Sequence, residues 1–255
     1  MKLTLVTGAS SGMGLEYAKQ LAAEGRDLLI VSNQEQQLLE VTADLADIYG
    51  VNVIPRYQDL ARQDAAKELF DFCNGQGYEI DCMILNAGMF FFSEITEEML
   101  PKVQKMMQLH MVTNTELCIL FGERMKQRSQ GRILLMASMA ASLPMPGITI
   151  YSATKAYLKS LGRSLYFEMR PYGVSVTTVC PAAIATPLYK LKENLMQLGI
   201  RFGIIWTPQR LVRRAIKGMK RGRRLMCPGF MNIWLPPLIA ALPKTLVLRL
   251  WKKFK

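Results

Sequence analysis

The sequence predicts an α/β protein in which a doubly wound parallel sheet of about seven strands is flanked by helices. Short apolar runs alternate along the chain with longer segments of helical periodicity. Several of these runs, such as 131–138, are mainly apolar, which is typical of strands that are buried on both faces. The 255 residues contain no internal repeat, low-complexity segment or linker. We therefore expect one domain, residues 1–229, with an apolar and basic extension, residues 230–255, packed on or beside it.

The first half of the chain alternates regularly between the two kinds of segment. A short apolar strand leads into a glycine cluster and a helix that runs to about Glu24, and three further strands follow with helices between them. Helix breaks are expected near Pro101, because proline cannot donate a backbone hydrogen bond. The expected segments are strands Leu3–Thr7, Asp27–Ser32, Val51–Arg56 and Ile80–Asn86, and helices Gln34–Ile48, Arg62–Cys73 and Thr96–Gln127.

The second half continues the same alternation. The expected strands are Gly131–Ser138, Val174–Cys180 and Arg224–Cys227, and the expected helices are Tyr151–Pro171 and Pro208–Lys220. Strands that alternate with helices of this length pair in parallel through right-handed crossovers.

Charge is distributed unevenly along the chain. The net charge is +12, and residues 190–255 carry 16 Lys/Arg against the single acid Glu193. Such asymmetry indicates an anionic partner: a membrane surface, a nucleic acid or an acidic ligand. We do not expect nucleic acid, because the basic residues are not interleaved with stacking aromatic residues and no reading motif is present.

Cysteine and histidine limit the possible chemistry. The five cysteines are widely spaced and form no CxxC pattern, so we expect a reduced, cytoplasmic protein without a disulfide framework or a metal site. The apolar run after Lys2 is too short for a signal peptide. Because His110 is the only histidine, any Ser-His-Asp hydrolase would have to use it.

The first candidate for chemistry is Tyr151 with Lys155. Residues four apart lie on the same face of a helix, so the phenol and the ammonium are expected side by side. A neighbouring cation lowers the pKa of a phenol from its usual value of about 10. Tyr151 is then suited to donate or accept a proton, although a solvated lysine over a packed tyrosine is the commoner arrangement.

The glycine cluster after the first strand is the second candidate. Residues 7–14 read Thr-Gly-Ala-Ser-Ser-Gly-Met-Gly, and the following segment is helical. A glycine-rich turn allows backbone N–H groups and a helix N-terminus to approach a pyrophosphate. An ordinary Gly/Ser loop is the alternative at this stage.

Four features now stand in one order: the glycine cluster, Asn86-Ala87-Gly88 after the fourth strand, Ser138 at the end of the fifth, and the Tyr151/Lys155 pair. Together they resemble the short-chain dehydrogenase/reductase family, from Lys2 to about Thr186. The resemblance implies a Rossmann-like sheet, a nicotinamide cofactor, and hydride transfer between that cofactor and a ketone or secondary alcohol.

The resemblance also implies roles for individual residues. Tyr151 would be the acid/base, Lys155 would lower its pKa and hold the nicotinamide ribose, and Ser138 would donate a hydrogen bond to the substrate oxygen. Asp59 could instead be a helix cap and Thr186 a turn residue. The implied cofactor-binding set is Gly8, Ser10, Ser11, Gly12, Met13, Gly14, Ser32, Asn33, Asp59, Leu60, Asn86, Ala87, Gly88, Tyr151, Lys155, Pro181, Ile184 and Thr186.

Three positions depart from the family pattern. His110 stands where the family usually has an asparagine that completes a proton relay; it either relays protons itself, with added pH sensitivity, or is a packed histidine. Ala182 replaces a glycine and stiffens the loop near the nicotinamide. Asn33 is neither the aspartate of NAD-preferring members nor the arginine of many NADP-preferring ones. Without a carboxylate to repel a 2′-phosphate, and with Ser32 and Asn33 able to hydrogen-bond it, NADP is expected, with NAD as the alternative.

Apolar side chains surround the expected substrate position. They occur in Pro187–Trp206, in Met89–Phe92 and in Met139–Met145, which follow three of the motifs. They indicate a hydrophobic carbonyl or alcohol such as a steroid, an acyl chain or another lipid. The alternative is that these side chains mostly pack against one another.

The C-terminal extension combines apolar and basic residues. Leu225–Pro243 carries no charge, but its prolines would interrupt a spanning helix. The extension suits peripheral contact with an anionic membrane surface. The same surface could instead cap the substrate site or close a subunit interface, and we expect a homodimer or homotetramer.

The leading hypothesis is thus an NADP- or NAD-dependent oxidoreductase acting on a hydrophobic ketone or alcohol. One alternative is a non-catalytic, cofactor-binding sensor or scaffold, which His110 and Ala182 would suit. Another is a protein whose main role is membrane tethering by its extension.

Overall fold

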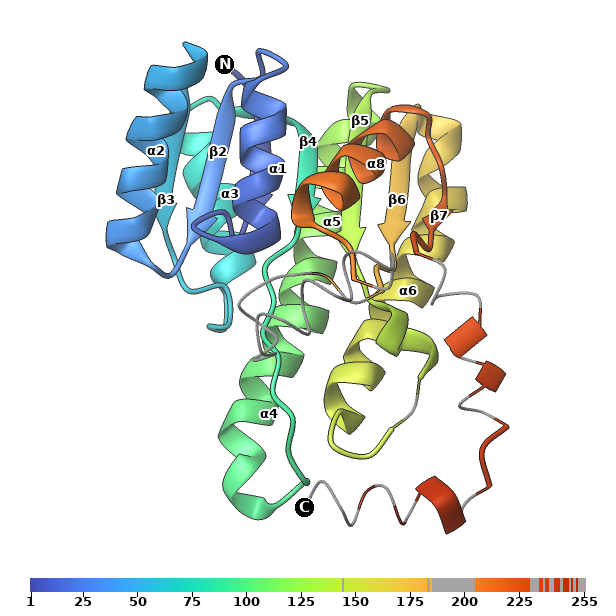
Figure 1. Cartoon of the computed structure of the whole chain (residues 1–255). Helices are drawn as coiled ribbons and strands as arrows, with labels where there is room; N and C mark the ends of the chain where they lie inside the picture. The colour runs from blue at the N-terminus through green and yellow to red at the C-terminus, as the bar shows by residue number, and fades with distance from the viewer. Residues whose placement is uncertain are drawn as a thin grey trace.

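The chain forms a seven-stranded sheet covered by helices on both faces (Figure 1). The computed structural model describes residues 1–143, 145–182, 184 and 205–229, with scattered positions between 234 and 251. The strand order is β3-β2-β1-β4-β5-β6-β7, and every neighbouring pair is parallel. The doubly wound α/β prediction is confirmed. The division at residue 230 stays a prediction.

Several strands end one or two residues earlier than their apolar runs. Asn86, Ser138 and Cys180 therefore lie just past the carboxyl ends of their strands rather than inside them. The strands are β1 (Lys2–Thr7), β2 (Leu28–Ser32), β3 (Val53–Tyr57), β4 (Glu79–Leu85), β5 (Gly131–Met136), β6 (Val174–Val179) and β7 (Leu225–Met226).

The helices alternate with these strands. The α-helices are α1 (Gly12–Ala22), α2 (Glu35–Tyr49), α3 (Ala65–Gly75), α4 (Leu100–Met107), α5 (Asn114–Gln127), α6 (Thr149–Met169) and α8 (Pro208–Lys220). Short 3₁₀ turns are η1 (Glu97–Met99), η3 (Met139–Ser142) and η4 (Arg170–Tyr172).

Two hydrophobic layers hold the sheet between the helices. On one face, buried residues of α3, α5 and α6, such as Leu69, Phe121 and Leu158, pack against the strands. On the other face, α1, α2 and α8 contribute residues such as Tyr17 and Leu211. Because both faces are covered, the central strands are almost entirely buried, as the sequence indicates, and even Thr4 and Thr7 of β1 are buried.

The long helical region is interrupted at a different place from the one predicted. Pro101 stands in the first turn of α4, where its missing N–H costs no hydrogen bond. The irregularity lies instead at η2 (Gln108–Thr113), a π-helical turn between α4 and α5. The Asn114 side chain donates to the carbonyls of Leu109 (3.2 Å) and His110 (3.1 Å) in this turn. It thereby links the π-helical turn to the first residue of α5.

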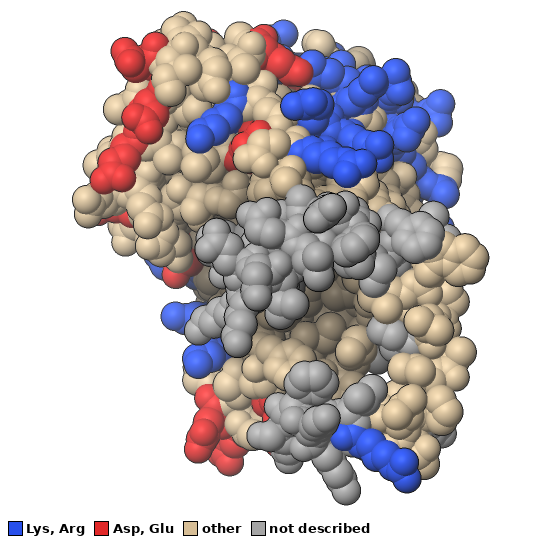
Figure 2. All heavy atoms as spheres, in the orientation of Figure 1, with Lys and Arg blue, Asp and Glu red and all other residues tan. Residues whose placement is uncertain are grey.

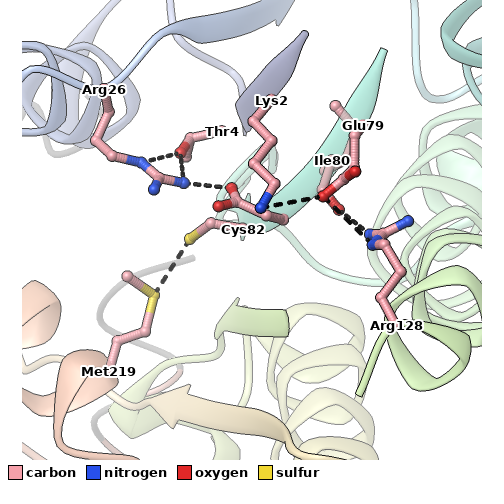
Figure 3. Close-up of polar contacts among 9 residues, drawn as sticks. Lys2, Thr4, Arg26, Glu79, Ile80, Cys82, Arg128 and Met219 are labelled. Carbon is pink, nitrogen blue, oxygen red and sulfur yellow. Dashed lines mark hydrogen bonds and ion pairs between the residues drawn. The ribbon is translucent and has the colours of Figure 1, made fainter. Parts of the chain in front are cut away.

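Polar contacts tie the amino ends of the central strands together (Figure 3). Arg26 donates to Thr4 Oγ1 (3.0 and 2.9 Å) and pairs with the buried Asp81. Arg128 pairs with Glu79 (3.4 Å) and donates to the carbonyl of Ile80 (2.9 Å). These contacts fix β1 against β4 at the edge opposite the strand ends that carry the motifs.

Candidate active site

A cleft of about 640 Å³ opens at the carboxyl ends of the strands, where the order reverses between β1 and β4. In open α/β sheets, this is the point at which ligands bind. The lining includes Gly8, Ser10, Ser11, Gly12, Met13, Ser32, Asn33, Asp59, Leu60, Asn86, Ala87, Gly88, Ser138, Tyr151, Lys155, Pro181, Ala182 and Ile184. Residues spread over more than 170 positions of sequence thus face one cleft.

The glycine cluster makes a tight turn at the start of α1. Gly8 and Gly12 have φ of 69° and 57°, a conformation that L-residues adopt rarely. A Cβ on Gly14 would lie 1.9 Å from the carbonyl oxygen of Gly8. Gly14 therefore does not line the cleft; it permits α1 to pack directly on the loop, and the first N–H groups of α1 face the cleft.

Thr7 connects this turn to β4. Its hydroxyl accepts hydrogen bonds from the backbone N–H groups of Asn86 and Ala87, both at 3.0 Å. Asn86 Nδ2 donates to the Thr7 carbonyl (3.2 Å), whereas its buried Oδ1 has no hydrogen-bond partner in the described part of the chain. An amide oxygen held in this way is suited to receive a donor from a bound ligand.

The end of β2 lies beside the glycine turn. Ser32 Oγ donates to Ser10 Oγ (2.8 Å) and accepts from the N–H of Gln34 (3.1 Å), so this hydroxyl already serves the protein. Asn33 is exposed at the rim of the cleft. Asp59 Oδ1 accepts from the N–H of Ala61 (3.0 Å) in a local turn and does not cap α3, which begins after Asp64.

Tyr151 and Lys155 lie in the first two turns of α6, at the inner end of the cleft. Lys155 Nζ is 5.6 Å from the centre of the Tyr151 ring and donates to the carbonyl of Met136 (2.8 Å). Both side chains are buried. Burial lowers the pKa of Lys155 to about 8. The Phe90 ring packs edge-on against the phenol at 4.9 Å between centroids.

Ser138 faces the same end of the cleft from the strand next to α6. Its hydroxyl oxygen accepts from the N–H of Ala140 (3.1 Å) and so caps η3. This contact fixes the oxygen and leaves the hydroxyl hydrogen to donate elsewhere.

His110 is fully buried behind the phenol and does not line the cleft. Its Nε2 accepts from the N–H of Met89 (3.0 Å), so a neutral ring carries its proton on Nδ1. Nδ1 lies 2.9 Å from Thr154 Oγ1, whose hydroxyl donates to the carbonyl of Tyr151 (2.9 Å). Burial, with a smaller effect of the Lys155 charge, lowers the pKa of His110 to about 2. The imidazole is thus held neutral by two protein partners.

Most of the sequence-predicted residues meet in the cleft, with three exceptions. Gly14 and His110 lie behind its wall, and Thr186 falls outside the described residues. Sequence reasoning missed Gln58, Lys105 and Leu109, which also line the cleft. Lys105 and Leu109 lie four residues apart, a helical spacing that could have identified a shared face of α4 and η2.

The apolar side chains near the cleft divide into two groups. Phe90 and Phe91 pack against a small cluster around Met106 and Tyr151, as the packing alternative predicts. Phe92 is half exposed and contacts Trp251 of the C-terminal extension, with 5.9 Å between ring centroids. Of the predicted substrate segment Pro187–Trp206, residues 187–204 lie outside the described residues. Ile205 and Trp206 are buried, and Trp206 packs in the hydrophobic layer that includes α8.

Within the described ranges, no group of three or more His, Cys, Asp or Glu side chains could hold a metal ion. Among those residues, too, no helix is long and apolar enough to cross a membrane.

The cleft fits a dinucleotide. Gly14 lets α1 pack on the glycine turn, so that Gly12 and Met13 at the start of α1 line the cleft with their N–H groups, and Asn86 offers an unsatisfied acceptor.

Known proteins provide an independent comparison. The family described as short chain dehydrogenase matches residues 2–195. The chain is 29% identical over 220 residues to a very-long-chain 3-oxoacyl-CoA reductase of Anas platyrhynchos, covering 83% of this chain and 67% of the relative. It is 27% identical over 255 residues to the reductase of that name from Homo sapiens, covering 96% and 77%.

Solved structures agree with this family match. A short-chain dehydrogenase from Sphingobium yanoikuyae in complex with NADPH has a TM-score of 0.80 and 26% identity, over 96% of this chain and 97% of that one. A bulky-bulky ketone specific alcohol dehydrogenase from Comamonas testosteroni has a TM-score of 0.79 and 25% identity, over 96% of each chain. Since the family match spans most of its length, the chain belongs to the short-chain dehydrogenase/reductase family and is an oxidoreductase that acts on CH–OH groups with NAD(P).

Proposed function

We propose that the chain interconverts a ketone and a secondary alcohol on a hydrophobic, acyl-like substrate, with NADP(H) as the preferred cofactor. The observation that carries this proposal is that Tyr151, Lys155 and Ser138 line the same cleft as the glycine turn. The relatives named as 3-oxoacyl-CoA reductases support an acyl chain over a steroid.

The bound cofactor would supply or accept the hydride. Tyr151 would donate a proton to the substrate oxygen during reduction, and the Lys155 ammonium beside it would favour the phenolate that remains. Ser138 would hold the same oxygen, because its hydroxyl oxygen accepts from the N–H of Ala140 and its hydrogen remains available to donate. We propose that Lys155 also holds the nicotinamide ribose.

The decisive experiment compares Tyr151→Phe with Tyr157→Phe. We expect Tyr151→Phe to lower kcat for NADPH-dependent reduction of a long-chain 3-oxoacyl-CoA by about 10²–10⁴-fold, the usual contribution of a general acid. NADPH binding, measured by fluorescence, should be unchanged. Tyr157 lies on the same helix, and its hydroxyl is 2.7 Å from Thr115 Oγ1. Tyr157→Phe therefore controls for the loss of a phenol from the same helix. If Tyr151→Phe were as active as the wild type, the assignment of Tyr151 as the general acid would be refuted.

We further propose that an anionic membrane surface is a partner. The exposed face of α8 carries Arg210, Arg213, Arg214, Lys217, Lys220 and Arg221. In Figure 2, Lys and Arg side chains gather in a patch over α8. Of the six, only Lys220 has an acidic partner among the described residues, Glu24 at 2.7 Å. Trp234 and Leu238 of the extension are about 60% exposed and would add apolar contact.

Sedimentation with phosphatidylcholine vesicles, with and without phosphatidylglycerol, tests this partner. Replacing Arg213, Lys217 and Arg221 together with Gln should weaken binding to anionic vesicles about a hundredfold, since each surface cation contributes about 1 kcal/mol. The control replaces the exposed Lys19, Lys67 and Lys102, an equal change of charge on scattered residues. Equal losses in both variants would mean that net charge alone attracts the chain.

We also propose a homodimer or homotetramer. Exposed apolar residues of α5 and α6, Ile119 and Phe167, support self-association.

A further inference from the structure

Two cysteines lie side by side at the carboxyl ends of β6 and β7. The parallel register pairs Thr178 with Leu225 and Val179 with Met226. The N–H of Cys180 donates to the carbonyl of Met226 at 2.7 Å, so the pairing continues past the strands. The next pair in this register is Cys180 with Cys227.

This arrangement permits a disulfide. Neighbouring strands are about 4.8 Å apart, and registered residues direct their side chains to the same side of the sheet. A disulfide joins Cα atoms that are about 4.4–6.8 Å apart. The two thiols already contact each other through a hydrogen bond in which Cys180 donates to the Cys227 sulfur.

The two thiols have different environments. Cys227 is exposed, whereas Cys180 is buried. The hydrogen bond from Cys180, together with Lys159 and Arg163 of α6, lowers the pKa of Cys227 to about 6. The same hydrogen bond and burial raise the pKa of Cys180. An exposed thiolate beside cations, with a second thiol in contact, is the environment of redox-active cysteines.

The other cysteines are different. Cys73, Cys82 and Cys118 are buried, and burial raises the pKa of each thiol to about 12. These three thiols should react slowly with peroxide and therefore serve as internal controls for the oxidation of Cys180 and Cys227.

The pair is also close to the cleft. Cys180 directly precedes Pro181 and Ala182, which line the cleft, and the Pro181 carbonyl accepts from the N–H of Met139 (2.8 Å). A covalent link at Cys180 would therefore tie the segment beside Ser138 to the start of the C-terminal extension.

We propose that Cys180 and Cys227 form an oxidation site, a dithiol that hydrogen peroxide converts into an intramolecular disulfide at the base of the cofactor cleft. The Cys227 thiolate attacks one peroxide oxygen, the O–O bond breaks, hydroxide leaves and takes up a proton, and Cys227 becomes a sulfenic acid. The Cys180 thiol then attacks that sulfur, the S–O bond breaks, and the S–S bond forms with release of a second water. Two electrons pass from the sulfurs to the peroxide, and a thiol reductant reverses the reaction.

The test uses the full chain and needs no substrate. The reduced protein is treated with hydrogen peroxide, the remaining thiols are alkylated with N-ethylmaleimide, and peptides are mapped by mass spectrometry without reduction. We expect the five thiols to fall to three, with Cys180 linked to Cys227, and dithiothreitol to restore all five. Retention of five thiols, or a link between other cysteines or between chains, would overturn the proposal.

Three variants make the result specific. Cys227→Ser should keep all four of its thiols at the same peroxide dose. Cys180→Ser should give a sulfenic acid on Cys227 that dimedone traps, because the resolving thiol is absent. Cys118→Ser should form the Cys180–Cys227 link as wild type does; failure of this control variant to form it would count against a local pair. Because every readout is a thiol, the proposal can fail while the oxidoreductase function stands, and the reverse.

Discussion

His110 Nδ1 lies 2.9 Å from Oγ1 of Thr154, and this contact joins the π-helical turn to the helix that carries the phenol. The hydrogen bonds continue from Thr154 to the backbone carbonyl of Tyr151, not to its side chain. We therefore expect His110 to position α6 rather than to relay protons, and the pH–rate profile should have no inflection near 6.5.

His110→Asn tests this role through stability. The pKa of His110 is about 2 in the folded chain and about 6.5 when unfolded, so the unfolded state binds more protons between these values. Wild-type stability should fall relative to the variant by about 1.4 kcal/mol for each pH unit below 6.5. Chemical denaturation of both proteins at several pH values measures the difference. His110 is the only histidine, so no other imidazole contributes; a difference independent of pH would contradict a buried neutral ring.

Lys155→Met should abolish activity yet stabilise the fold. Burial lowers the pKa of Lys155 to about 8, so the folded state binds fewer protons than the unfolded state from pH 8 to about 10.5. At pH 7 the buried charge therefore costs stability, and methionine should gain about 3 kcal/mol. This gain should shrink as pH rises through 8 towards 10.5. Thermal denaturation of both proteins at pH 7 and pH 10 measures this gain in stability. A gain that grows with pH would contradict a lowered pKa of Lys155.

Gly14→Ala should destroy the cofactor site. The added Cβ would lie 1.9 Å from the Gly8 carbonyl oxygen, so α1 must move away from the glycine turn. We expect NADPH affinity to fall at least tenfold, measured by fluorescence titration. Gly75→Ala is the matched control, because Gly75 ends α3 and its added Cβ meets no atom within 4 Å. Equal affinity in both variants would mean that α1 does not shape the site.

Asn33 should decide between the two cofactors. The Ser32 hydroxyl is occupied by Ser10 and Gln34, so the exposed Asn33 side chain is the better candidate to meet a 2′-phosphate. Asn33→Asp should raise the KM for NADPH about tenfold by charge repulsion, and Asn33→Arg should lower it. The ratio of kcat/KM for NADPH and NADH measures the change. If both variants shift this ratio in the same direction, the charge at residue 33 does not determine the preference between NADPH and NADH.

Much of the fold and the cleft could be predicted because local patterns determine them. The glycine cluster, Asn86, Ser138 and the Tyr151/Lys155 pair each follow a strand, and parallel strands bring their carboxyl ends to one edge. Periodicity could not reveal the π-helical turn, because α4 before it has only eight residues, too few to show that the apolar face rotates by the roughly 100° that one extra residue adds. It also could not settle His110, whose role depends on Met89 and Thr154, partners far away in sequence.

The hydrogen bonds between Thr7 and Asn86 join positions 79 residues apart. A nascent chain cannot complete this contact until β4 has been synthesised, and the wall at Pro181 comes almost a hundred residues later. Pairing of distant parallel strands is also slow, because loop closure precedes its stabilising contacts. Affinity for the nucleotide should therefore appear late in synthesis. Ribosome-bound chains that are arrested before β6 should not bind the nucleotide.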